Sequence, residues 1–169
     1  MRRLIRTLGL CFTTFFIVGP AAANGCFGAG QPLFHCTFKN GAKALDICLQ
    51  GDLLLYRYGA LAGKAELLLA SRVENTHMRP WNGVGSSIYE EASFANGDVT
   101  YTAFYAVARI AADAPDVSGG IIVTKGDQTL ANLTCDSGSI EPSDFYPIFE
   151  EKNAQGQCWN TDTFTWGGC

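Results

Sequence analysis

Hydrophobic and polar residues alternate with a period of two along most of the chain after residue 30. In the stretch 99–107, for example, Val99, Tyr101 and Tyr105 share one face of an extended strand, whereas Thr100 and Phe104 share the other. The pattern alone leaves open which of these faces is the core. Segments of this kind, rich in β-branched and aromatic residues, predict strands. They are 32–38, 43–50, 52–58, 64–71, 86–94, 98–109, 119–125 and 128–135.

Turn signals separate these segments. Asn40-Gly41 and Asn96-Gly97 lie between apolar runs, and Asn-Gly readily adopts the positive φ angles of a two-residue hairpin turn. Gly51-Asp52 and Gly126-Asp127 mark further tight connections. Adjacent antiparallel strands with short turns predict an all-β fold, a small antiparallel barrel or sandwich of about eight strands in a meander.

Two regions interrupt this pattern. Residues 72–85 form a long predicted loop that holds His77 and Trp81, and long loops in compact domains are often functional. From residue 137 the alternation fades, with a short helix expected near Phe145 and an aromatic loop between the last two cysteines. We therefore expect a β domain over 24–136 and a C-terminal extension over 137–169, rich in Cys and aromatic residues, that packs on it.

The first residues have the features of an export signal. Arg2, Arg3 and Arg6 precede a mostly apolar run over 8–18, and small residues lead up to Ala23. The run is shorter than the roughly 20 residues that cross a bilayer, which disfavours a membrane anchor. We predict a signal peptide over 1–23, cleaved after Ala23.

Two other export routes fit less well. Arg2-Arg3 could belong to a twin-arginine signal, but that route exports folded chains, and cytosolic thiols stay reduced. Cys26 could be a lipoprotein acceptor, but lipidation would leave an odd number of other cysteines in the mature chain. Cleavage after Ala23 leaves an even six. An even number of cysteines can pair completely. This favours a protein that is soluble after cleavage, in the periplasm or outside the cell.

The six mature cysteines predict three disulfides among fifteen possible pairings. They are Cys26, Cys36, Cys48, Cys135, Cys158 and Cys169. Nearness in sequence favours Cys158 with Cys169. A turn at Asn40-Gly41 would pair position 36 with 45, so Cys36 and Cys48 are not directly opposed. A bond from either of them to Cys135 would instead join the first hairpin to the last strand. The chain has no C-x2-C spacing, so we expect neither a metal site nor a redox pair.

Charge narrows the choice of partners. The chain has 12 basic and 16 acidic residues, for a formal net charge of −4. Removing the leader takes three arginines and no acid, so the mature balance becomes −7. This disfavours nucleic acid, which requires clustered Lys and Arg, and would attract a cationic partner.

Catalytic motifs are missing from the sequence. His35 and His77 are its only histidines; His35 lies in a predicted strand, so His77 is the better candidate for a role. No G-x-S-x-G, H-E-x-x-H or P-loop motif occurs. Glu90 and Glu91 are neighbours in a strand and point to opposite faces, so they cannot act as a glycosidase pair. We expect no enzymatic activity and no cofactor.

One short stretch resembles a known family. Ser118-Gly119-Gly120-Ile121, followed by Thr124-Lys125-Gly126 and the strand 130–133, is similar to a motif of bacterial periplasmic inhibitors of c-type lysozyme, which are small eight-stranded barrels. The resemblance implies that Ser118 and Lys125 enter the lysozyme cleft and contact its catalytic carboxylates. An acidic inhibitor would suit a cationic lysozyme. In this chain Ile121 stands where the family has an aromatic residue, and the two motif residues are closer in sequence.

Three functions follow as hypotheses. The first is an exported, non-catalytic binding or structural protein, and the second is a lysozyme inhibitor acting through Ser118 and Lys125. The third is a glycan-binding module in which Trp81, or the cluster of Trp159, Phe164 and Trp166, stacks on sugar rings; the alternative for these aromatics is packing at an open end of the fold. The candidate binding residues are Ser118, Lys125, His77 and Trp81. The candidate partners are a cationic protein such as a lysozyme, or a glycan, and the oligomeric state is left open.

Overall fold

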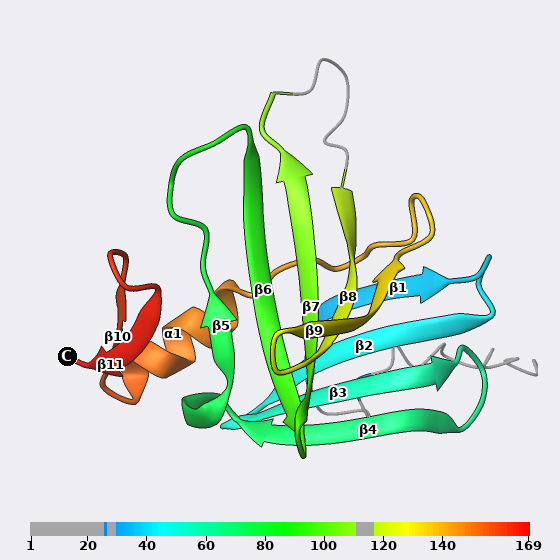
Figure 1. Ribbon diagram of the computed structural model, residues 1–169, viewed down its shortest axis with the longest axis horizontal. Coiled ribbons are helices and arrows are strands. Elements are labelled where there is room, and N and C mark those ends of the chain that lie inside the picture. The colour runs from blue at the N-terminus through cyan, green and yellow to red at the C-terminus, as the bar shows by residue number, and fades with distance from the viewer. Residues whose placement is uncertain (1–25, 27–29, 111–116) are drawn as a thin grey trace, which may run out of the picture.

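The predicted strands form two antiparallel sheets in a computed structural model that describes residues 26, 30–110 and 117–169 (Figure 1). The predicted leader lies outside these residues. The first sheet has the order β1-β2-β3-β4. Its strands are β1 (Gln31–Phe38), β2 (Lys43–Gln50), β3 (Leu53–Ala60) and β4 (Ala65–Arg72).

The second sheet has the order β5-β6-β7-β8-β9. Its strands are β5 (His77–Arg79), β6 (Ser87–Asn96), β7 (Val99–Ala108), β8 (Val117–Lys125) and β9 (Gln128–Thr134). All eight predicted strands are present. The segment predicted as one long loop instead contains the 3₁₀ helix η1 (Val73–Asn75) and the edge strand β5. Three residues are too few for a visible alternation, which is why the sequence pattern missed β5.

The turns follow the glycine signals closely. Gly51-Asp52 and Gly126-Asp127 are two-residue connections, as predicted. Asn96 pairs with Val99, so that turn is centred one residue later than predicted, on Gly97-Asp98. In the first hairpin Cys36 pairs with Leu45, which confirms the predicted register.

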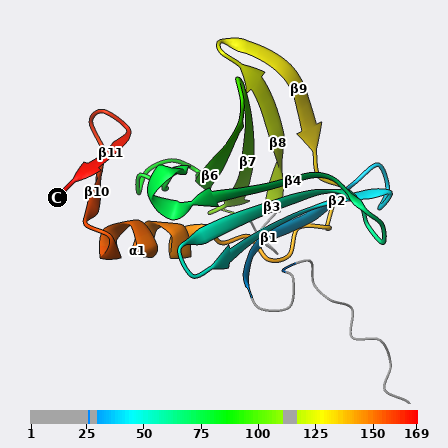
Figure 2. The ribbon, with the colours of Figure 1, turned by 90° about the horizontal axis from the view of Figure 1, so that it is seen from below.

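The core lies between the two sheets, whose strands cross steeply (Figure 1), as in orthogonal sheet packing. Seen from below, the first sheet lies as one layer across the strands of the second (Figure 2). Ala103 and Tyr105 of β7 are buried and Tyr101 packs against the core, so this is the inner face that the sequence left open. Tyr56 packs on Phe94 with ring centres 5.2 Å apart.

The sheets are joined by the segment that follows β9. In this segment Asp136 donates its backbone N–H to Thr37, and Glu141 and Asp144 donate to other carbonyls of β1. Within the part of the chain that the structure describes, no strand ladder closes the two sheets into a barrel, so the fold corresponds to the predicted sandwich.

Three disulfides bind the fold, as predicted: Cys26–Cys48, Cys36–Cys135 and Cys158–Cys169. The second ties the first hairpin to the residue after the last strand of the second sheet, which is one of the two links expected from the sequence. Three disulfides indicate an oxidising compartment. None of the helices in the described residues is both long and apolar enough to cross a membrane.

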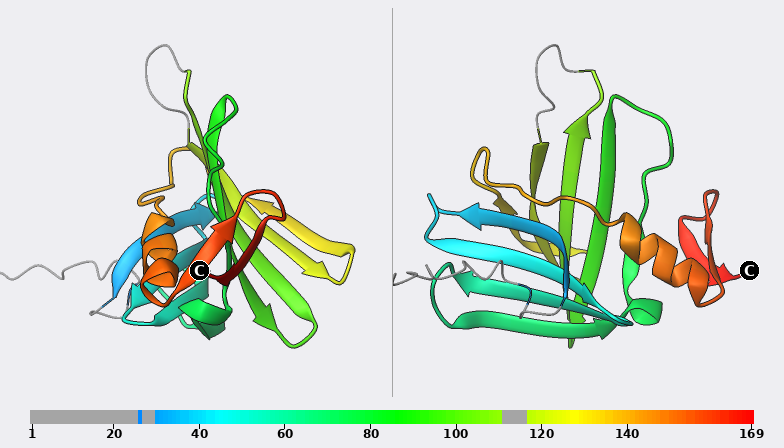
Figure 3. Two further views of the ribbon diagram at one scale, coloured as in Figure 1. Left: turned by 90° about the vertical axis from the view of Figure 1, so that its left-hand side faces the viewer. Right: turned by 180° about the vertical axis from the view of Figure 1, so that it is seen from behind.

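The C-terminal extension contains more regular structure than predicted. Helix α1 (Tyr146–Ala154) has Pro147 in its first turn, where proline is tolerated. The aromatic loop is a hairpin of β10 (Gln157–Asn160) and β11 (Thr165–Gly168), closed by Cys158–Cys169. Helix and hairpin lie beside β5, at the end of the molecule away from β9 (Figures 1 and 3).

Candidate functional site

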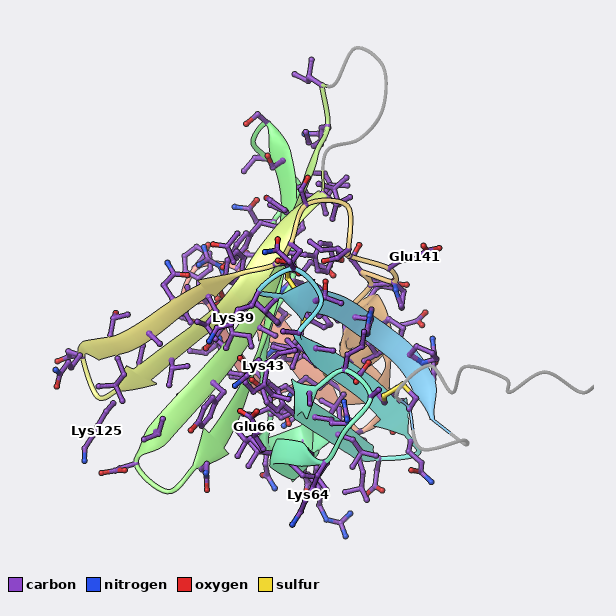
Figure 4. The ribbon with its side chains drawn as sticks, turned by 90° about the vertical axis from the view of Figure 1, so that its right-hand side faces the viewer. Lys39, Lys43, Lys64, Glu66, Lys125 and Glu141 are labelled. Carbon is purple, nitrogen blue, oxygen red and sulfur yellow. A yellow bond between two sulfur atoms is a disulfide. The ribbon has the colours of Figure 1, made fainter. Side chains whose placement is uncertain are left out.

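The structure separates the two residues that the lysozyme-inhibitor resemblance requires. Ser118 pairs with Ala106 near one end of β8, and Lys125 pairs with Val99 at the other end. Seven residues of strand span about 23 Å. Lys125 lies at the tip of the β8–β9 turn and forms an ion pair of 2.6 Å with Asp98 (Figure 4). The two side chains therefore do not form one contact point.

The other two candidates lie together at the β5 edge of the second sheet. His77 is the first residue of β5, and Trp81 follows the strand by two positions. Two separate grooves open along this edge, each containing one of these residues.

The first, which we call the Trp81 groove, has a volume of about 200 Å³. Its lining combines two aromatic rings with short polar side chains and an arginine. The lining residues are Arg79, Pro80, Trp81, Asn82, Val84, Ser87 and Tyr89. This combination of ring faces and hydrogen-bonding groups is typical of small-ligand sites.

Internal contacts hold the loop that forms this groove. Trp81 donates its indole N–H to the carbonyl of Val84 at 3.1 Å, and the Val84 N–H donates to the Asn82 side chain at 3.2 Å. The Arg109 guanidinium lies 4.8 Å from the centre of the Trp81 ring and donates to the Gly85 carbonyl at 2.9 Å. The indole is thus positioned before any ligand arrives, which lowers the entropy cost of binding.

Tyr89 is fixed from the other side of the groove. Its ring stacks on Phe104 with centres 6.1 Å apart, and its hydroxyl donates to the Glu91 carboxylate at 2.6 Å. Burial and this hydrogen bond raise the pKa of Tyr89. The phenol therefore stays protonated at neutral pH. Glu91 faces outward while Glu90 is buried, as predicted for neighbours in a strand.

The second, which we call the Lys152 groove, has a volume of about 290 Å³ and lies between η1, β5, α1 and the hairpin. It is mainly polar. The lining residues are Glu74, Asn75, Thr76, His77, Lys152, Gln157, Thr165 and Trp166. Lys152 is only 1% exposed, and burial lowers its pKa to about 8.

The aromatic cluster of the C-terminal hairpin mostly packs on itself. Trp166 lies between Trp159 and Phe149, with ring centres 5.5 and 5.3 Å away, and it packs against the core. Phe164 is 44% exposed and lies under Arg79, whose guanidinium is 5.1 Å from the ring centre. These contacts indicate that Trp159 and Trp166 pack within the protein, which disfavours a role for them in stacking on a sugar.

His35 takes part in a polar row across the first sheet. Its Nδ1 lies 2.7 Å from the Asp46 carboxylate, which also accepts a hydrogen bond of 3.2 Å from Arg57. Arg57 in turn donates to the carbonyls of Ala60 and Gly63 and so holds the β3–β4 turn. The adjacent cavity is about 50 Å³, room for little more than a water molecule. We interpret this row as structural.

Sequence reasoning missed Arg79, Tyr89, Arg109 and Lys152. Arg79 carried a usable signal, because it is two residues from Trp81 and so shares its loop. Tyr89 comes beside the loop only through the β5–β6 pairing. Arg109 follows β7 and reaches the Trp81 ring from outside the groove lining. Lys152 reaches its groove through the packing of α1, which no local pattern specifies.

Within the described ranges, no group of three or more His, Cys, Asp or Glu side chains is placed to hold a metal ion. Neither a family model, nor a curated protein, nor a solved structure matches this chain.

Proposed function

We propose that this protein is an exported, non-catalytic binding protein and that it holds a glycan in the Trp81 groove. The observation that carries the proposal is the groove itself, in which a pre-positioned indole and a phenol line a cleft together with Arg79, Asn82 and Ser87.

Sugars match this lining chemically. A pyranose ring has apolar C–H faces, which stack on aromatic rings, and a rim of hydroxyl groups, which both donate and accept hydrogen bonds. Trp81 and Tyr89 supply ring surface that is amphipathic and costs little conformational entropy to order. Asn82 supplies a donor and an acceptor, and Arg79 supplies donors only. A volume of about 200 Å³ suits one sugar unit, with the rest of a chain lying outside the groove.

The acidic mature balance supports this choice over a nucleic acid, whose bases could also stack on Trp81. With the predicted leader removed, the chain has a net charge of −7, which repels a polyphosphate with one charge on every nucleotide far more than a sugar with one negative charge or none.

Binding to a glycan array, followed by isothermal titration with the best ligand, tests the proposal. Trp81→Ala should weaken binding by at least about tenfold, the loss of one stacked ring. Trp159→Phe is the matched control, because Trp159 lines neither groove. An array without binding above background, or equal loss in both variants, would overturn the proposal.

A further inference from the structure

The Lys152 groove is a second site on the same edge. It shares no lining residue with the Trp81 groove, yet the two grooves are neighbours along β5. His77 lines one and Arg79 lines the other, and residues i and i+2 of a strand lie on one face about 7 Å apart. One extended ligand can therefore reach both.

Lys152 is a buried cation with neutral partners. Its Nζ donates to the Glu74 carbonyl at 3.3 Å and to the Gln157 side-chain oxygen at 3.0 Å, and it lies 5.0 Å from the centre of the Trp166 ring. Among the residues that the structure describes, no carboxylate oxygen comes within 4.0 Å of it. Buried charges in proteins are usually paired.

An ammonium has three N–H donors, and these two oxygens use two of them. The Glu74 carboxylate attracts Lys152 from beyond ion-pair distance and so balances its charge only in part. The remaining donor belongs to a residue that lines a groove of about 290 Å³. A monoanion in the groove would supply a third acceptor and an ion-pair partner at contact distance. The Glu74 carboxylate also lines the groove, which disfavours a ligand of higher negative charge.

The remaining lining suits a sugar that bears such an anion. Asn75 and Gln157 provide amides, Thr165 a hydroxyl and His77 an imidazole, all of which hydrogen-bond to hydroxyl groups. Arg79, which lines the neighbouring Trp81 groove, adds a second positive charge at this edge. Resting on the proposed function, we infer that the glycan is acidic and that the Lys152 groove binds the carboxylate of a uronic acid unit.

The test is an array in which uronic acid oligosaccharides stand beside their carboxyl-reduced, neutral counterparts. The native protein should bind at least one acidic member about tenfold or more tightly than its reduced counterpart, the discrimination given by a charged hydrogen bond. Lys152→Met keeps an apolar contact to Trp166 and should reduce this ratio to about one.

Gln157→Glu gives a second, independent test. It places a carboxylate where an amide oxygen now lies 3.0 Å from Nζ, so the lysine gains an internal counter-ion. The variant should fold and lose the preference for acidic members. Lys125→Met removes an exposed, paired lysine elsewhere and should leave the preference unchanged.

The outcomes separate this inference from the proposed function. Equal binding of acidic and reduced members, with Trp81 still required, overturns the acidic specificity and leaves glycan binding intact. An acidic preference that survives both groove variants overturns the role of Lys152. Loss of all binding to the array in the native protein overturns the proposed function and this inference together.

Discussion

Trp166 donates its indole N–H to the main-chain carbonyl of Met78 at 2.6 Å, joining residues that are 88 positions apart. Met78 is the central residue of β5, an edge strand that pairs only with β6. The hydrogen bond satisfies a carbonyl that faces away from the sheet, and it anchors the C-terminal hairpin to the side of the second sheet. The edge on which both grooves lie is thus held by a residue from the far end of the chain.

Trp166→Phe should loosen the hairpin without unfolding the sandwich. The ring contacts to Trp159 and Phe149 are largely kept, but the Met78 carbonyl loses its donor, at a cost of about 1–3 kcal/mol. Hydrogen exchange should show faster exchange of the β10 and β11 amides, with β7 unaffected. Trp159→Phe is the control, and equal exchange in the two variants would contradict the anchoring role.

Two of the three disulfides should contribute different amounts to the free energy of unfolding: Cys158–Cys169, which the sequence favoured, and Cys36–Cys135, one of two links that it left open. Cys36–Cys135 closes a loop of 99 residues and Cys158–Cys169 a loop of 11. By loop entropy the first contributes about 4.7 kcal/mol and the second about 3 kcal/mol. Urea unfolding of the paired Cys→Ala variants measures both losses. A larger loss from the hairpin disulfide would show that loop entropy does not govern them.

The regular part of the fold follows from local signals. Alternation places eight strands, and the glycine turns set their order, because each hairpin forces its two strands to be neighbours. The division into two sheets has no such local cause. It arises after β4, where η1 and the short β5 redirect the chain, and three residues cannot carry a readable pattern.

The candidate site was only half predictable for a related reason. His77 and Trp81 are conspicuous because they lie in the longest interruption of the strand pattern. Lys152 is an ordinary charged residue on a short helix, and only the docking of α1 against η1 and the hairpin buries it. Lys152 is distant in sequence from most residues that it contacts. Ser118 and Lys125, by contrast, are close in sequence but far apart in space, because a single extended strand separates them.

Gly120→Ala should destabilise the second sheet strongly. A Cβ at this position would lie 2.0 Å from the Leu133 carbonyl oxygen of the neighbouring strand, so the β8–β9 ladder would have to separate. We expect a loss of about 3 kcal/mol, at the upper end for overpacking. The matched control is Gly167→Ala, because nothing lies within 4 Å of its added Cβ. Its change should stay within about 0.5 kcal/mol. Equal stabilities, measured by thermal unfolding, would contradict the close approach.

Ser118 and Lys125 should not act together on a lysozyme. Their separation along β8 prevents one loop from carrying both side chains into a cleft. We expect the mature protein to leave the clearing of a bacterial suspension by c-type lysozyme unchanged at micromolar excess. Inhibition that is lost in both Ser118→Ala and Lys125→Ala would restore the inhibitor hypothesis and require a two-point contact.

Glu90 should make the protein less stable as pH rises, whereas an ordinary salt-bridged carboxylate makes a protein more stable as pH rises. It is 6% exposed and accepts hydrogen bonds from the Tyr105 hydroxyl at 2.5 Å and the Phe145 N–H at 3.2 Å. Burial raises its pKa above the ordinary 4.5, although these two hydrogen bonds offset part of the effect.

Between 4.5 and the raised pKa, the folded protein binds more protons at Glu90 than the unfolded chain does. The free energy of unfolding must therefore fall as pH rises through this window, by about 1.4 kcal/mol for each unit of separation. Glu90→Gln keeps an acceptor for Tyr105 and Phe145 but removes the titration. The difference in unfolding free energy between native protein and Glu90→Gln, measured in urea from pH 4 to pH 8, should shift in favour of the variant as pH rises above 4.5 and become constant above the raised pKa. Glu150→Gln, on the exposed side of α1, controls for the loss of one carboxylate. A difference that stays constant across this range would mean that the two hydrogen bonds fully offset the cost of burying the charged carboxylate.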